Sequence, residues 1–114
     1  MKVVRVYTGD DNRSHFEEID LPFAADGETT PPIPNTGVVF RRRSLGFVLD
    51  WHPAPRHQWV INLEGESEIE VGDGTIRRLG PGDALLAEDL TGQGHILRGV
   101  GDVPLVTLSI PLES

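Results

Sequence analysis

Apolar and polar residues alternate along short stretches of this chain, and no window of ten or more residues shows a helical period. The clearest alternation runs over residues 66–71. It puts three glutamates on one face and a serine, an isoleucine and a valine on the other, as a half-buried strand requires. The dominant pattern therefore predicts β-strands.

Turn residues separate these stretches. Gly72-Asp73-Gly74 is a strong hairpin signal, Gly80-Pro81-Gly82-Asp83 predicts a second turn, and the prolines of residues 24–37 predict a loop. We expect strands near residues 2–8, 15–21, 37–42, 45–51, 57–63, 66–71, 75–79, 84–87, 95–100 and 105–110. Many short strands with glycine and proline between them indicate a sandwich or a barrel.

Length and charge narrow the class of protein. The 114 residues predict one domain, 1–114, and the net charge of −8 makes nucleic-acid binding unfavourable. One basic run, Arg41-Arg42-Arg43, adjoins apolar segments. We expect solvated arginines on a strand or turn there, with an anion or partner site as the alternative.

The chain has no cysteine, which excludes disulfides, thiolate ligands and a cysteine nucleophile. Its first residues lack the apolar core of a signal peptide, and no apolar run has the length of a membrane span. We therefore predict a cytoplasmic protein without a membrane partner.

Histidines supply the candidate chemistry. His52, His57 and Gln58 lie within one short stretch, WHPAPRHQWVINLEG, and His95 follows the glycine-rich run GQG some forty residues later. In a small all-β chain, such spacing predicts that the imidazoles meet at one end of the cavity. Imidazole binds divalent transition metals and also transfers protons near neutral pH.

Spacing within these stretches resembles the two motifs of the cupin superfamily. Gly46 and His52, with five residues between them, match the opening of the first motif; Gln58 and Gly65, with six residues between them, match its close. Ala54 stands at the position of the second histidine of that motif, and Gln58 stands at the position of its glutamate.

In the second motif, Gly92 and His95 keep the family spacing, whereas Leu90 and Gly99 replace its proline and asparagine. The resemblance covers residues 45–110, and residues 1–44 hold N-terminal strands and the proline-rich loop. It implies an all-β fold: a small single-domain cupin-like β-barrel, an antiparallel double-sheet jelly roll.

The resemblance also implies a metal site made by His52, Gln58 and His95, which project into the barrel mouth. The metals that cupins hold there are iron, manganese, nickel, zinc or copper. An amide adds no charge, so Gln58 should hold a cation less firmly than the usual carboxylate. A metal-free pocket is the alternative, in which the same three residues are hydrogen-bond partners.

Other residues complete the predicted site. We expect His57 or Glu88 to move the proton in catalysis, although an exposed or interface position for His57 is the alternative. Gln58, Trp51 and Trp59 are candidates to bind the ligand, and the tryptophans are also candidates for the core.

The leading hypothesis is a metal-dependent enzyme of oxygenase, isomerase or cyclase type that acts on a small molecule. Its rival is a non-catalytic, metal-free module that binds or senses a small ligand. Whether the chain is an enzyme is left open at this point. Because a lone barrel leaves edge strands, we also predict a homodimer, with the N-terminal strand as the contact.

Overall fold

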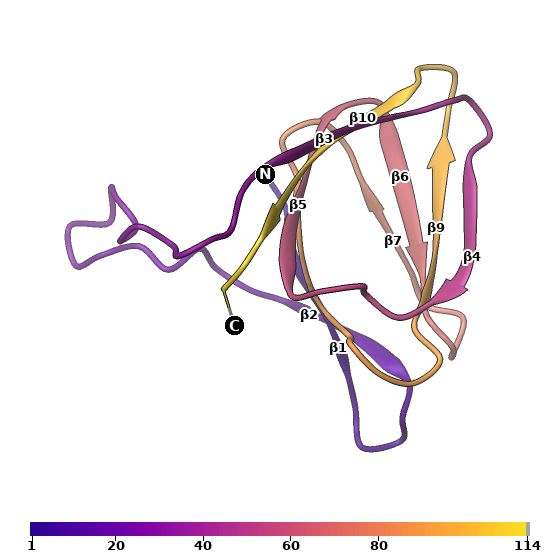
Figure 1. The fold of residues 1–114 in the computed structure, drawn as a ribbon, viewed down its shortest axis with the longest axis horizontal. Coiled ribbons are helices and arrows are strands. Elements are labelled where there is room, and N and C mark those ends of the chain that lie inside the picture. The colour runs from indigo at the N-terminus through magenta and orange to yellow at the C-terminus, as the bar shows by residue number, and fades with distance from the viewer. Residues whose placement is uncertain (114) are drawn as a thin grey trace.

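Two β-sheets face each other and enclose the interior of the molecule (Figure 1). The computed structural model describes residues 1–113, which form ten strands and no helix, and therefore no helix that could cross a membrane. The strands are β1 (Val3–Thr8), β2 (Ser14–Glu18), β3 (Val39–Arg43), β4 (Val48–His52), β5 (Gln58–Glu64), β6 (Glu66–Glu70), β7 (Ile76–Leu79), β8 (Ala84–Glu88), β9 (His95–Val100) and β10 (Leu105–Pro111).

One sheet has six strands in the order β2-β1-β8-β5-β10-β3, and the other has four in the order β4-β9-β6-β7. All neighbouring strands are antiparallel except β1 and β8, which are parallel. The predicted all-β double-sheet jelly roll is confirmed, and the predicted strands match the observed ones to within a few residues.

The N-terminal strand is not a free edge. β1 is hydrogen-bonded to β2 on one side and to β8 on the other, so the edges of the six-stranded sheet are β2 and β3. The predicted pairing of this strand with a second copy is therefore wrong, because both of its hydrogen-bonding sides are occupied. The homodimer itself stays a prediction.

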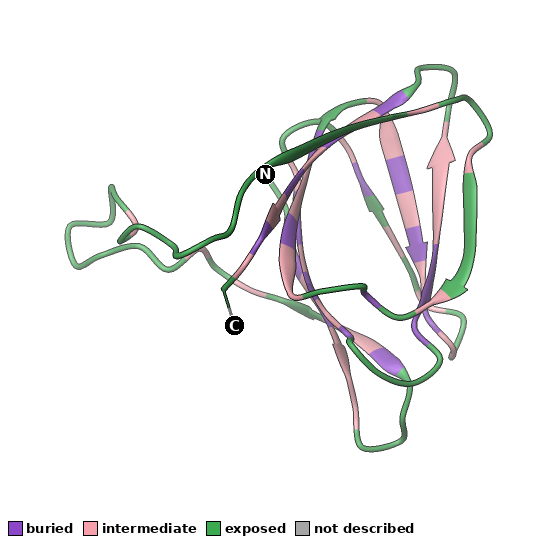
Figure 2. Ribbon diagram, in the orientation of Figure 1, coloured by how far each residue is buried: buried purple, intermediate pink, exposed green. Residues whose placement is uncertain are grey.

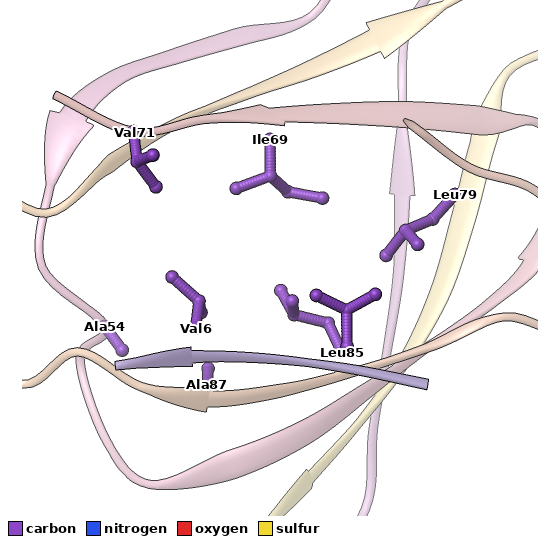
Figure 3. Close-up of a cluster of buried hydrophobic side chains, with 8 residues drawn as sticks. Val6, Ala54, Ile69, Val71, Leu79, Leu85 and Ala87 are labelled. Carbon is purple, nitrogen blue, oxygen red and sulfur yellow. The ribbon is translucent and has the colours of Figure 1, made fainter. Parts of the chain in front are cut away.

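The core lies between the two sheets. Figure 3 shows Ile69 and Val71 pointing from one sheet toward Val6 and Leu85 of the other, and all four side chains are buried. The alternation predicted over residues 66–71 is confirmed, since its serine, isoleucine and valine are the buried members. Burial of these apolar side chains is the main force that holds the sheets together.

A long arm, residues 19–38, connects β2 to β3 and extends away from the barrel (Figure 1). Nearly all of it is exposed (Figure 2). Near its C-terminal end, the arm is attached to the end of the chain by an isolated antiparallel β-bridge between Asn35 and Leu112. The barrel, and not the arm, therefore positions the candidate site.

Candidate functional site

A cavity of about 400 Å³ lies between the two sheets, within the size range of small-molecule sites. Most of its lining is apolar, and both sheets contribute to it. Its polar lining residues are Arg41, Arg43, His52, Gln58, Asn62, Ser67, His95, Thr107 and Ser109.

A β-bulge turns His52 into this cavity. The register between β4 and β9 shifts between Leu49 and His52, and both residues line the cavity although they are three positions apart. Regular alternation would send them to opposite faces of the sheet, so the extra residue brings His52 inward. His52 Nδ1 lies 2.8 Å from the backbone carbonyl oxygen of Asp50, which fixes the ring.

His95 is held by a buried carboxylate. It begins β9 directly opposite His52, and its Nδ1 lies 2.6 Å from Asp89 Oδ2. The hydroxyl of Ser14, the first residue of β2, donates to the same oxygen at 2.6 Å. Asp89 is 0% exposed, so the carboxylate is fixed by these two donors within the protein.

Glycines allow the loop before β9 to reach this position. Gly94 has φ of +76°, and a Cβ there would overlap the backbone carbonyl of His52. A Cβ at Gly92, with φ of +79°, would overlap the backbone carbonyl of Asn12. The glycine-rich run is therefore needed for the contact between the loop and the end of β4.

The two imidazoles lie side by side, with ring centroids 4.5 Å apart and planes tilted by 58°. A carbonyl and a carboxylate accept hydrogen bonds, so each Nδ1 is the donor, and in the neutral form of each ring Nε2 keeps a lone pair. Burial, and then the neighbouring His95, hold the pKa of His52 below its usual 6.5, against the opposing hydrogen bond to Asp50. Neutral His52 is the form that coordinates a metal.

The pair fits a divalent metal ion. Two imidazoles bound through Nε2 at about 2.1 Å, and at a right angle, have centroids about 4.5 Å apart, which is the spacing observed. Donation of the other ring nitrogen to a carbonyl or carboxylate is also typical of metal ligands. Residues 1–113 contain no group of three His, Cys, Asp or Glu placed for a metal, and Gln58 lines the same cavity as the two histidines.

His57 and Glu88 meet each other but not the cavity. His57 Nε2 lies 2.6 Å from Glu88 Oε2, and the Arg5 guanidinium donates to the other carboxylate oxygen. Ala87 lines the cavity, so strand alternation directs Glu88 to the opposite face of the sheet. A group that moves a proton in catalysis is expected to line the cavity, and neither His57 nor Glu88 does so.

The tryptophans also lie outside the cavity lining. Trp59 is buried on the outer face of β5, where it pairs with Leu86 and Ile110, because Gln58 beside it faces inward. Trp51 lies in the bulge and is 39% exposed. Of Gln58, Trp51 and Trp59, only Gln58 lines the cavity, together with His52 and His95.

Two residues that orient His95, Asp89 and Ser14, were not predicted as members of the site. The signal for Asp89 was an alternation that continues past the end of β8, since Leu85, Ala87 and Asp89 are all buried. The predicted solvated arginines on a strand are confirmed, since Arg41 and Arg42 of β3 are exposed and Arg43 is half-buried, and Arg41 and Arg43 also line the cavity. Ser14 had no comparable signal, since it joins the site through sheet pairing.

The fold has counterparts among solved structures. The chain is similar to an uncharacterised conserved protein with a double-stranded β-helix domain from Klebsiella pneumoniae, with 24% identity and a TM-score of 0.54. The match covers 79% of this chain and 87% of that one. The chain is also similar to an RmlC-like cupin protein from Desulfovibrio desulfuricans, with 19% identity, a TM-score of 0.46, and coverage of 96% of this chain and 82% of that one. No family model and no curated protein matches the sequence. The chain thus has the double-stranded β-helix fold, and the cupin-like barrel predicted from its motifs is confirmed.

Proposed function

We propose that this chain binds a small organic molecule in the barrel cavity and holds a divalent metal ion at one end through His52, His95 and Gln58. One observation carries the proposal. Two imidazoles lie side by side at the cavity, and each has its Nδ1 bound to a fixed acceptor of the protein. This leaves the Nε2 atom of each ring available to donate its lone pair to a metal ion.

The chain's own residues prepare this end of the cavity. Asp89 orients His95 through its Nδ1, while the carbonyl of Asp50 orients His52. The apolar walls exclude water and confine the bound molecule. A divalent ion held there by His52, His95 and Gln58 would supply Lewis acidity suited to polarising a carbonyl or enol oxygen. These features suit an enzyme of oxygenase, isomerase or cyclase type.

A metal-free binding module is the second candidate. Ala54 lines the cavity and is 4% exposed, so the position of the second histidine of the cupin motif contributes a methyl group and no donor. Without a metal, the free nitrogens of His52 and His95 accept hydrogen bonds from a hydroxyl or N–H group of the ligand.

Metal content and zinc titration separate the two candidates. Untagged protein is analysed for metals and then titrated with Zn²⁺, beside the variants His52→Ala and His95→Ala. The control is His15→Ala, because His15 pairs with Asp11 in the β1–β2 hairpin and does not line the cavity. We expect one ion per chain in the wild type and the control, and loss of binding in both site variants. A wild type that binds no Zn²⁺, Fe²⁺, Ni²⁺ or Cu²⁺ would leave the metal-free module.

A further inference from the structure

Two arginines of β3, Arg41 and Arg43, line the cavity, whereas Arg42 between them does not. Arg41 lies opposite Thr107 and Arg43 opposite Leu105 of β10, and both partners also line the cavity. Strand alternation accounts for this placement. The basic run thus puts two permanent positive charges at the cavity and one on the other face of the sheet.

No carboxylate of residues 1–113 neutralises these two charges. Neither aspartate nor glutamate lines the cavity, and neither guanidinium takes part in any of the ion pairs of the described chain. Arg41 Nη1 donates to Ser109 Oγ at 3.1 Å, and the Arg43 guanidinium lies 4.4 Å from the centre of the Phe47 ring. Both contacts hold the guanidinium in place and leave its charge available to a ligand.

The arginines and the histidines mark different parts of the cavity. The Phe47 ring lies under the Arg43 guanidinium, and the backbone carbonyl of Phe47 accepts a hydrogen bond from the backbone amide of Gly99 in β9. Gly99 lies four residues from His95 along the same strand. Four residues of a strand span about 13 Å. Between these points Leu49 and Leu97 pair across β4 and β9, and both line the cavity.

Resting on the proposed binding of a small organic molecule, we infer that this molecule is an amphipathic carboxylate. Arg41 and Arg43 bind its carboxylate, because the planar guanidinium matches that group in shape and charge. Its apolar body lies against Leu49 and Leu97, and its far end reaches the His52–His95 pair. The net charge of −8 over the whole chain repels anions, so the two arginines are what allows an acidic ligand to bind in the cavity.

A matched set of probes tests this assignment by calorimetry. Octanoate, octanol, octylamine and octyl phosphate share an eight-carbon chain and differ in the head group. Each is titrated into the wild type, Arg41→Gln/Arg43→Gln, Arg41→Lys/Arg43→Lys and, as the control, Arg42→Gln. Arg42 belongs to the same strand but does not line the cavity. Circular dichroism checks that each variant is folded, and the lysine variant keeps the charges if the glutamine variant does not fold.

We expect octanoate to bind the wild type and Arg42→Gln equally, and the double glutamine variant at least about tenfold more weakly. Octanol should bind all four proteins alike, and the double lysine variant should keep part of the affinity for octanoate. Equal binding of octanoate and octanol to the wild type would overturn the inference and leave the proposed function standing. Tighter binding of octyl phosphate would overturn the choice of a carboxylate, and binding of no probe at all would overturn the inference, while the zinc titration still tests the proposed metal site.

Discussion

At the scale of single residues, the site depends on groups that orient the histidines. Asp89 accepts hydrogen bonds from Ser14 and His95 through one oxygen, and it is fully buried. This carboxylate sets which nitrogen of His95 carries the proton and where the other nitrogen points. The ring would be free to turn or to change tautomer if the carboxylate were lost.

Replacement of this carboxylate should weaken metal binding. We expect Asp89→Asn to lower the affinity for Zn²⁺ by about 10- to 100-fold, because the hydrogen bond that orients His95 loses its charge. Competition with a chromogenic chelator measures the affinity. Glu88→Gln is the control, since Glu88 is the adjacent acid but lies outside the cavity lining. Equal affinities in both variants would contradict this role of Asp89.

Gly94 should be the least replaceable glycine near the site. The methyl group of Gly94→Ala would overlap the His52 carbonyl at a residue that already has positive φ. We expect it to lower the free energy of unfolding, measured by urea denaturation, by about 2–3 kcal/mol. Gly74→Ala is the control: φ there is +89°, but a Cβ would meet nothing within 4 Å. That substitution should cost about 1 kcal/mol. Equal costs would show that the close approach to His52 does not matter.

At the scale of elements, the sequence located the strands better than it located their faces. Alternation and turn residues predicted all ten strands, because both signals are local. In β10, however, Thr107 and Ser109 face the cavity, while Leu108 and Ile110 lie on the other side. The bulge that brings His52 inward also depends on pairing with β9, which no local pattern reveals.

One side chain connects strands of the two sheets. Asn62 of β5 donates at 3.0 Å to Ser67 Oγ of β6 and at 3.0 Å to the carbonyl of Leu79 in β7, and it is 2% exposed. We expect Asn62→Ala to destabilise the fold by about 2–3 kcal/mol, since it leaves buried acceptors unpaired. Ser67→Ala removes one of the two bonds and should cost less. A larger loss in the serine variant, measured in urea, would contradict this account.

At the scale of the whole molecule, a carboxylate joins the N-terminus to the barrel. Asp83 accepts hydrogen bonds from the backbone amides of Lys2 at 2.6 Å and Gly80 at 2.8 Å, beside the parallel pair β1 and β8. Burial alone would raise the pKa of Asp83, but these two donors hold it below its ordinary 3.8. The ionised form therefore stabilises the native pairing.

The ionised Asp83 carboxylate predicts part of the loss of stability of this protein at acidic pH. A folded pKa below the unfolded value means that the stabilisation is complete above pH 3.8 and is lost as the pH falls through the folded pKa. Asp83→Asn should cost about 1 kcal/mol at pH 7, and should unfold with a weaker dependence on pH below 4. Thermal unfolding at a series of pH values measures both effects, with Asp10→Asn on an exposed turn as the control. An unchanged pH dependence would contradict the role of Asp83.

The central claim is that His52 and His95 direct their free nitrogens toward one point. Long-range ¹H–¹⁵N spectra of the four histidine side chains, recorded with and without Zn²⁺, test it most directly. The account predicts Nδ1–H tautomers for His52 and His95, and a shift of both Nε2 signals on addition of one equivalent of zinc, with His15 and His57 unchanged. An Nε2–H tautomer at His95, or zinc shifts confined to His15 or His57, would contradict it.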